Sequence, residues 1–265
     1  MGAIVTLLSD FGDADGFVGI MKGVVLSIAP EAAIVDITHA VPPQQILPGA
    51  LLLRSAVPYF PARSIHLAVV DPGVGSDRQA LAIRTEQGIL VGPDNGLLSL
   101  AAEAGGVVEI VALENPTYVA PKRSQTFHGR DVFAPAVAHL AAGVPLAELG
   151  PSRSGFVRLV LPQPHEQADA ITGEVIYIDH FGNLLTNISA EKLAGFREQI
   201  DSVSIAGVSV NGPMAAYAAV AEGALLAIVN SWDVLEIAVR NGSAAACLGV
   251  SIGAPVQVRR RSKHE

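Results

Sequence analysis

The sequence predicts two domains: an N-terminal α/β domain with a mostly parallel sheet, then a smaller C-terminal domain whose strands form a barrel or a sandwich. In the first part, strand-like apolar runs alternate with helical patterns, which is typical of an α/β domain. In the second, short β-type segments are separated by turn residues. Half of the 265 residues are hydrophobic and only 16% are charged, as in a compact protein with buried strands.

The N-terminal elements follow one another in a strand and helix order. Strand-like runs occupy 3–9, 32–37 and 64–70, and helical patterns occupy 16–29 and 44–57. Residues 79–92 alternate around a turn at Glu86, Gln87 and Gly88, which predicts two further strands. Ligands of open α/β sheets bind beyond the carboxyl ends of the strands. We therefore expect the polar turns at 9–17, 71–78, 92–100 and 126–133 to converge on one site.

The composition changes at residues 161–170, which are rich in proline and polar side chains and predict a linker. The predicted domains accordingly span residues 1–163 and 170–265. Strands of the second domain are predicted at 173–179, 184–188, 202–210, 224–230, 234–239 and 255–260, with one helix at 189–196.

Charge and hydropathy exclude several classes of protein. The net charge is −8 and the only basic cluster is the terminal stretch 259–265, interpreted as a solvated end, so no nucleic acid partner is expected. We find neither a membrane-spanning stretch nor a signal peptide, and expect a cytoplasmic protein without a membrane partner. The single cysteine, Cys247, excludes an internal disulfide and a cysteine-cluster metal site, and its apolar neighbours predict that it is buried.

The stretch VVDPGVGSDR, residues 69–78, is not a dinucleotide loop, because Arg78 replaces the third glycine and strands follow instead of a helix. It keeps a carboxylate, Asp71, seven residues before the guanidinium of Arg78. Such a pair commonly closes a turn, and His128, just before a helical pattern, could simply cap or pack. Together the three supply a carboxylate, a cation and a base, a set that could position and deprotonate water.

An acidic turn holds Asp10, Asp13 and Asp15, and three interpretations of it stay open. The carboxylates could cap the following helix, accept the two hydroxyls of a ribose diol, or bind a divalent metal. The turn is too short for an EF-hand and lacks its distal glutamate. Five other histidines show no zinc-binding spacing: His39, His66, His139, His165 and His180.

Two motifs in the second domain combine an aromatic residue with polar side chains. IDHFGNLLTN contains Asp179, Phe181 and Asn183, and NSWDVLEIAVRNG contains Ser231, Trp232, Glu236 and Arg240. Each could be a tight hairpin with an exposed aromatic ring. Each could equally be part of a stacking surface with amide groups beside it, which suits a purine.

Taken in order, the motifs SDFG-x-x-D, VVDPGVG-x-x-R, GPDNGLL, TFHGRD, IDHFGNLLTN and NS-x-x-x-LEIAV-x-NG resemble the S-adenosylmethionine (SAM) hydroxide adenosyltransferase family, relatives of the fluorinase and chlorinase. The resemblance runs from Leu7 to about Val258. It implies an α/β domain, a β-barrel-like domain and a homotrimer with each site between two subunits. It also implies hydrolysis of SAM at ribose C5′ to adenosine and methionine, without a cofactor because SAM is the substrate.

The resemblance assigns roles to individual residues. It places Asp71, Arg78 and His128 in catalysis, and the following in SAM binding: Asp10 at the ribose diol, Asp15 and Asp179 at the methionine end, Asn183 and the Val239 backbone at adenine, Phe181 along the purine, and Ser231 and Glu236 at ligand contacts. Trp232 stands where the fluorinase has an arginine near the methionine carboxylate, so that contact is not carried over. Arg240 receives no role.

The halide-using relatives differ from this chain at Asp71, at Gly129 and by an insertion absent between Ala80 and Asp94, which favours hydroxide over halide. Our mechanistic hypothesis is that His128 accepts a proton or hydrogen bond from water while Arg78 stabilises hydroxide and Asp71 orients both. Clearing an unwanted SAM stereoisomer would be a reason for the reaction. The alternatives are a SAM-dependent halogenase, a non-catalytic SAM or adenosine sensor, and a metal-dependent phosphate-ester hydrolase built on the acidic turn.

Overall fold

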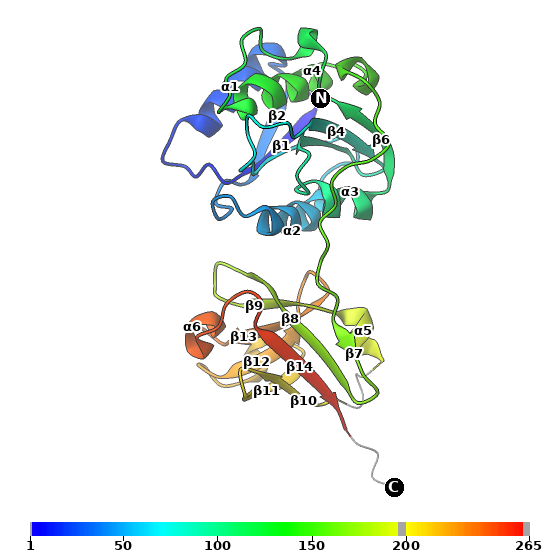
Figure 1. Cartoon of the computed structure of the whole chain (residues 1–265). Coiled ribbons are helices and arrows are strands. Elements are labelled where there is room, and N and C mark those ends of the chain that lie inside the picture. Colours follow the sequence, from blue (N-terminus) through cyan, green and yellow to red (C-terminus); the bar gives the residue numbers. More distant parts are fainter. Residues whose placement is uncertain (1, 196–199, 262–265) are drawn as a thin grey trace. The chain divides into compact units, whose positions relative to one another are not determined.

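The computed structural model describes residues 2–195 and 200–261, which divide into two compact units, Met1–Leu159 and Val160–Glu265 (Figure 1). The division lies beside the proline-rich stretch 161–170. Part of that stretch forms a short strand, β7 (His165–Glu166), which pairs with the first long strand of the second unit.

The first unit is built on one mixed sheet of the order β2-β1-β3-β5-β4-β6. Its strands are β1 (Ile4–Ser9), β2 (Ala33–Thr38), β3 (Ile65–Val69), β4 (Ala80–Thr85), β5 (Ile89–Pro93) and β6 (Val107–Ala112). Strands β2, β1, β3 and β5 are mutually parallel, and β4 runs antiparallel to both β5 and β6. The mostly parallel sheet and the hairpin around Glu86 to Gly88 are thereby confirmed.

Helices cover both faces of this sheet, which is why its central strands read as nearly continuous apolar runs. The α-helices are α1 (Phe17–Ile28), α2 (Ile46–Ala56), α3 (Ser99–Gly105) and α4 (Ala134–Ala141), and short 3₁₀ turns lie at Val57–Tyr59, Pro116–Tyr118 and Leu146–Leu149. Val5 and Leu7 of β1 pack with α1 and α4 on one face, and Leu8 packs with α2 and α3 on the other.

The second unit is a closed β-barrel, as the resemblance implied, rather than a sandwich. Its barrel strands are β8 (Ala170–Ile178), β9 (Leu184–Ser189), β10 (Ile200–Ile205), β11 (Val208–Met214), β12 (Leu225–Val229), β13 (Val234–Val239) and β14 (Pro255–Arg260). They pair in the order β14-β10-β11-β12-β13-β9-β8, and the pairing of β14 with β8 closes the ring. Short helices α5 (Ala190–Ala194) and α6 (Ala244–Leu248) and a 3₁₀ turn at Tyr217–Ala219 lie between strands.

Two expectations about the second unit change in detail. The helix predicted over 189–196 is α5, and the last predicted residue lies outside the described residues, as do the last four of the basic terminus. Cys247 is exposed, so the prediction that it is buried was wrong. The reason is that only one side of α6 packs against the barrel. Ala244 and Leu248, four residues apart, lie on that side, and Cys247 does not.

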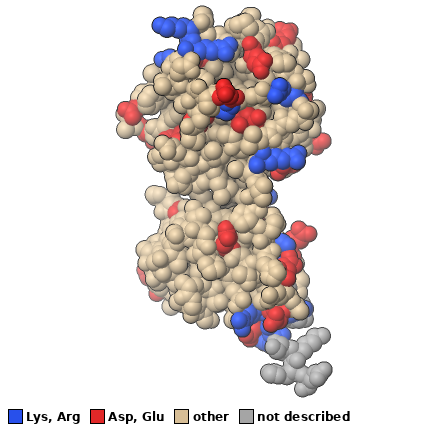
Figure 2. All heavy atoms as spheres, in the orientation of Figure 1, with Lys and Arg blue, Asp and Glu red and all other residues tan. Residues whose placement is uncertain are grey.

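The surface shows dispersed charge. On the face in Figure 2, lysines and arginines lie in small separate groups among acidic residues, without a continuous basic stripe. Within residues 2–195 and 200–261, every helix is too short or too polar to cross a bilayer.

Candidate active site

Asp71 and Arg78 form a buried ion pair in the loop after β3. Nε of Arg78 donates to both carboxylate oxygens of Asp71, at 2.9 and 3.0 Å, and Nη2 donates to Oδ2 as well. Only 5% of the Asp71 side chain and 10% of the Arg78 side chain are exposed. The guanidinium carbon also lies 5.3 Å from the centre of the Phe133 ring. A forked contact of this kind fixes the plane of the guanidinium.

His128 joins this pair through the same guanidinium. Nη2 of Arg78 lies 2.9 Å from Nδ1 of His128, and because an arginine can only donate, Nδ1 must be the acceptor. A neutral imidazole whose Nδ1 accepts carries its proton on Nε2. The pKa of His128 is lowered, first by burial and then by the Arg78 charge, with opposing contributions from Asp71 and Asp131. The free ring nitrogen of His128 is therefore an N–H donor.

The loop that carries His128 is held from within. His128 precedes a single π-helical turn, Gly129–Phe133, which leads directly into α4. Asp131 in that turn is buried and accepts from Arg130 Nε at 2.6 Å and from the Ser124 backbone N–H at 2.7 Å. The hydrogen bond from Arg130 lowers the pKa of Asp131. The sequence predicted helix α4 but not the π turn that sets the orientation of His128.

Gly75 lets this loop approach the loop of Asp71 and Arg78. Its φ is +81°, and a Cβ there would lie 2.6 Å from the backbone oxygen of Gln125. Only glycine meets both demands, because side chains disfavour positive φ and the neighbour is rigid backbone. The two loops interlock at this point.

The polar turns predicted to converge are linked by direct contacts. Phe127, next to His128, packs against Phe11 and Phe17 of the first turn, with ring centres 6.0 and 5.2 Å apart. Asn95 of the turn after β5 donates from Nδ2 to the Val70 carbonyl at 2.9 Å, just before Asp71. The four turns therefore contact one another at this edge of the sheet, and a common site there stays a prediction.

The acidic turn does not cap α1. The N-cap position is Gly16, without a side-chain cap, and no acidic residue lies in the first helical turn. Oδ2 of Asp10 instead accepts the Gln44 backbone N–H at 2.8 Å, and Asp13 and Asp15 are exposed. Within the parts of the chain that the structure describes, no group of three or more His, Cys, Asp or Glu side chains could hold a metal ion.

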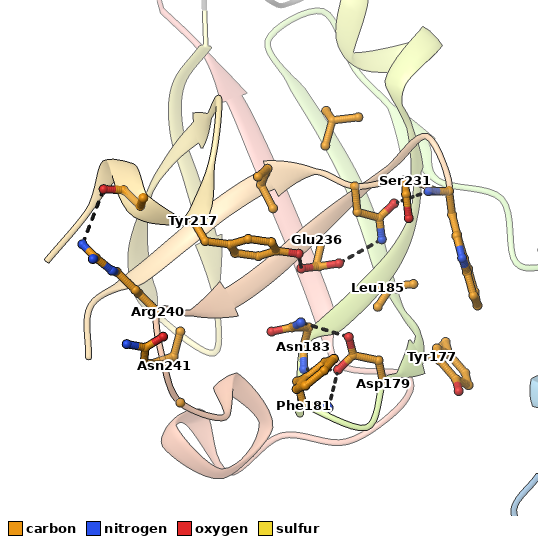
Figure 3. Close-up of a pocket in the computed structure, with 17 residues that line it drawn as sticks. Tyr177, Asp179, Phe181, Asn183, Leu185, Tyr217, Ser231, Glu236, Arg240 and Asn241 are labelled. Carbon is orange, nitrogen blue, oxygen red and sulfur yellow. Dashed lines mark hydrogen bonds between the residues drawn. The ribbon is translucent and has the colours of Figure 1, made fainter. Parts of the chain in front are cut away.

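The second unit contains a pocket of about 960 Å³ (Figure 3), a volume typical of small-molecule sites. All predicted binding residues of the C-terminal motifs line it: Asp179, Phe181, Asn183, Ser231, Trp232, Glu236 and Val239. Arg240, to which no role was assigned, lines it as well. The predicted set of the first unit, Asp10, Asp15, Asp71, Arg78 and His128, lies in the loops described above.

Asp179 organises one side of the pocket. Its Oδ1 accepts the backbone N–H groups of Phe181 at 2.9 Å and Asn183 at 2.8 Å, and its Oδ2 accepts Nδ2 of Asn183 at 2.9 Å. Asn183 is buried by this arrangement, whereas 72% of Phe181 is exposed. The exposed ring beside a fixed amide matches the stacking interpretation of the motif.

Glu236 lies inside the pocket wall with both oxygens engaged. Tyr217 donates from its hydroxyl to Oε1 at 2.7 Å, and Asn230 donates from Nδ2 to Oε2 at 2.9 Å. Burial raises the pKa of Glu236, although both hydrogen bonds oppose the shift. Burial and the bond to Glu236 raise the pKa of Tyr217 as well.

The remaining wall residues are held by backbone contacts and stacking. Trp232 stacks on Tyr177 with ring centres 5.4 Å apart and planes at 28°. Arg240 donates from Nη1 to the Val220 carbonyl at 2.7 Å, and the Val239 carbonyl accepts the Gly242 N–H at 3.1 Å.

Sequence reasoning missed Tyr177, Tyr217 and Asn230, all of which line the pocket. Asn230 begins the NS motif and so had a signal. Tyr217 lies in the plain stretch AAYAA, where nothing in the sequence marks it.

Comparison with known proteins gives a consistent result. Models of the SAM hydroxide adenosyltransferase N-terminal and C-terminal domains match residues 5–150 and 173–257. The (R)-S-adenosyl-L-methionine hydrolase of Salinispora tropica is 44% identical over 96% of this chain and 97% of its own. A fluorinase of Actinoplanes sp. is 31% identical over 70% of this chain and 71% of its own.

An uncharacterized conserved protein from Thermotoga maritima has a crystal structure similar to this one, with a TM-score of 0.90 and 36% identity over 97% of this chain and all of that chain. The chain belongs to the SAM hydroxide adenosyltransferase family.

Proposed function

We propose that the protein hydrolyses SAM to adenosine and methionine by attack of water or hydroxide at ribose C5′. The observation that carries the proposal is the Arg78 guanidinium, which joins Asp71 and His128 in one hydrogen-bonded cluster. The 44% identity to a named SAM hydrolase over nearly the whole chain supports the same reaction. That relative's name specifies the (R) form, and the proposal extends to a preference for this sulfonium stereoisomer.

The reaction requires a nucleophile but no acid. The oxygen forms a bond to C5′ while the C5′–S bond breaks, and both electrons of that bond return to sulfur, so the sulfonium leaves as the neutral thioether of methionine. The proton of the attacking water passes to solvent. Since bulk water has a pKa of about 15.7, a nearby cation must favour its ionisation. Arg78 and the substrate sulfonium are two positive charges that can do this.

The geometry changes the role that we assign to His128. With Nδ1 accepting from Arg78, Nε2 carries a hydrogen and cannot take a proton from water unless the contact to Arg78 breaks. His128 then holds the nucleophile by donating from Nε2, and its lowered pKa keeps it neutral. This replaces the hypothesis that His128 is the base. Asp71 keeps the guanidinium in plane and compensates its charge.

Binding is assigned to the remaining residues. As proposals we keep Asp10 at the ribose diol, Asp15 and Asp179 at the methionine end, Asn183 and Val239 at adenine, and Phe181 along the purine ring. Ser231, Trp232 and Glu236 complete the pocket wall. No cofactor enters the reaction, because SAM already supplies the leaving group.

The proposal includes a homotrimer in which each site takes the first unit of one subunit and the second unit of a neighbour. Mixing two variants that are both inactive at a SAM concentration far below their KM tests this: Arg78→Ala subunits lack the first half and Asn183→Ala subunits lack the second. Reassembled mixed trimers should regain activity at sites that receive two intact halves. Mixed trimers that stay inactive would contradict shared sites, and light scattering after size-exclusion chromatography checks the trimer itself.

We also place the protein in the cytoplasm, since its one exposed thiol suits a reducing compartment.

The deciding assay incubates the purified protein with SAM and quantifies adenosine and methionine by chromatography. Equal amounts of both products, lost in Arg78→Ala, are expected. Parallel reactions contain fluoride or chloride, and a 5′-halo-5′-deoxyadenosine would replace the hydrolase by the halogenase. Binding of SAM without turnover would identify a sensor, and loss of activity in EDTA would revive the metal interpretation. A mixture of sulfonium stereoisomers shows which one is consumed.

A further inference from the structure

We propose that Glu236 is a positioning residue that holds two opposite walls of the C-terminal pocket, through Tyr217 on one side and Asn230 on the other. The inference rests on the proposed function, because it takes this pocket to bind part of SAM. In Figure 3 the Tyr217 hydroxyl points at the Glu236 carboxylate, and dashed lines mark the hydrogen bonds that Glu236 accepts.

Glu236 is buried and both of its oxygens are hydrogen-bonded, as expected of a residue with a structural role. It lies in the middle of β13 and only 3% of it is exposed, so its carboxylate has lost nearly all contact with water. A buried carboxylate is costly unless hydrogen bonds replace its hydration. Tyr217 and Asn230 supply one each, at 2.7 and 2.9 Å, to different oxygens. One carboxylate therefore links the Tyr217 segment to the turn at Asn230.

The first wall is the ring of Tyr217. Its residue is 43% exposed although its hydroxyl is fixed on Glu236, so an open aromatic surface is held at one end. The same segment is fixed a second time, because Arg240 Nη1 donates to the carbonyls of Val220 at 2.7 Å and Ala218 at 3.5 Å. An aromatic ring with a restrained hydroxyl makes a rigid contact surface at low entropic cost.

The second wall is the turn that begins at Asn230. Oδ1 of Asn230 accepts the backbone N–H groups of Trp232 at 2.9 Å and Val234 at 3.4 Å. The amide orientation is therefore set, and its NH₂ group must face Glu236. The turn carries Ser231 and Trp232 into the pocket lining, and it contains Asp233 at φ +56°. Glu236 thus controls where these two side chains stand.

This donor and acceptor pattern makes Glu236→Gln disruptive despite its nearly equal shape. The new amide can accept from Tyr217, but its NH₂ group then faces the NH₂ group of Asn230. If Asn230 turns over, its NH₂ group faces the N–H groups of Trp232 and Val234 instead. Either arrangement leaves two donors opposed in a buried place, which costs more than the loss of one bond. In a third arrangement the glutamine oxygen accepts from Asn230 and its NH₂ group donates to the Tyr217 oxygen; the Tyr217 hydrogen then loses its acceptor, and both bonds lose their charged partner.

The double variant Asn230→Asp with Glu236→Gln restores the pattern. Oδ1 of the new aspartate still accepts from Trp232 and Val234, and its other oxygen accepts the new glutamine NH₂ group. The glutamine oxygen still accepts from Tyr217, and the net charge of the group is unchanged. A role in positioning predicts rescue, whereas direct binding of ligand by the Glu236 charge predicts none.

The test measures steady-state kinetics and ligand binding on the full-length protein. Trp232 is the only tryptophan and lies in the pocket, so its fluorescence reports SAM and adenosine binding directly. For Glu236→Gln we expect KM to rise about tenfold while kcat changes less than about twofold. Tyr217→Phe, which removes only the hydroxyl, should raise KM about threefold, and the double variant should return to within about threefold of the parent.

Thr186→Val is the matched structural control. It removes a buried hydrogen bond of 2.8 Å from Thr186 to the Leu235 carbonyl, in the same barrel but outside the pocket lining. It should lower the melting temperature and leave KM unchanged. If Glu236→Gln does not fold, Tyr217→Phe and the double variant decide the matter. Unchanged KM in folded variants, or no rescue by the double variant, would overturn the inference. A parent protein that does not hydrolyse SAM would instead refute the proposed function, whatever the variants do.

Discussion

Each unit buries a carboxylate, but the hydrogen-bond partners of the two carboxylates differ in charge. Asp71 is paired with the charged guanidinium of Arg78, which also donates a hydrogen bond to His128. Glu236 is held by a phenol and an amide, both neutral. A cation can stabilise hydroxide and a developing negative charge, whereas neutral donors can only hold shape. From this comparison we assign the proposed chemistry to the first unit, whereas the pocket of the second unit would contribute binding alone.

The largest effect should follow from removing the cation. Arg78→Ala should lower kcat by about 10³-fold and change KM less than about threefold, because the guanidinium acts on the nucleophile and not on the bound adenosine. Stopped reactions analysed for adenosine measure both constants. Arg84→Ala is the control, since it removes an arginine of β4 whose ion pair with Glu109 is partly exposed. A rise in KM as large as the loss in kcat would break the division between the units.

The next effect separates the two nitrogens of His128. In His128→Asn the amide oxygen takes the place of Nδ1, and in His128→Gln the amide nitrogen takes the place of Nε2. If His128 donates to the nucleophile, the glutamine variant should lose about tenfold in kcat and the asparagine variant about 100-fold. A base would make both variants equally poor, because neither amide accepts a proton.

The pH dependence sharpens the same point. The pKa of His128 is lowered by burial and by Arg78, so the ring stays neutral as the pH falls through 6.5 and activity should decline only below that value. Protonation would put a hydrogen on Nδ1 against the donor Nη2 of Arg78. The His128→Gln variant should lack this decline in a profile of kcat/KM against pH. A decline that persists unchanged would assign it to another group.

The sequence predicted the parts of the molecule that depend on local pattern. The parallel strands and the Glu86 to Gly88 hairpin follow from periodicity, and the position of Asp71 follows from the turn at the end of β3. His128 precedes a helix and does not end a strand, and its role beside Asp71 and Arg78 came from the resemblance. Polar residues at the ends of parallel strands are brought together by the sheet itself, so spacing along the chain is enough to find them.

Contacts across the barrel could not be predicted in this way. Tyr217 reaches Glu236 and Trp232 stacks on Tyr177 because the strands curve into a ring, which no local period encodes. The orientation of His128 was also beyond the sequence, because it depends on a π turn and on which nitrogen meets Arg78. The capping interpretation of the acidic turn does not hold for α1, because Gly16 occupies the N-cap position.

A smaller change tests how closely the two loops of the first unit must fit. Gly75→Ala adds a side chain at φ +81°, where its Cβ would lie 2.6 Å from the Gln125 oxygen. The loops should separate, and kcat should fall about tenfold without any change in the reacting groups. Gly143→Ala is the control, because it has positive φ, at +96°, but nothing within 4 Å of the new atom. Equal activity of both variants would show that the interlocking is dispensable.

The smallest effect on activity concerns His66, which is buried in β3 and hydrogen-bonded to Thr6 at 2.8 Å. Burial lowers its pKa to about 4 from 6.5, so the unfolded chain binds a proton there that the folded chain does not. Stability should therefore fall by about 3 kcal/mol as the pH drops from 6.5 to 4. Urea unfolding at several pH values should show a shallower fall in Thr6→Val/His66→Leu, with kcat at pH 7 unchanged. An equally steep fall in that variant would place the acid sensitivity elsewhere.

The central claim is that the oxygen added to the substrate comes from water and bonds to ribose C5′. Incubating the protein with SAM in oxygen-18 water, followed by mass spectrometry of both products, tests it directly. We predict one labelled oxygen in the 5′-hydroxyl of adenosine and none in methionine. Unlabelled adenosine, or a 5′-halogenated nucleoside in its place, would contradict the account.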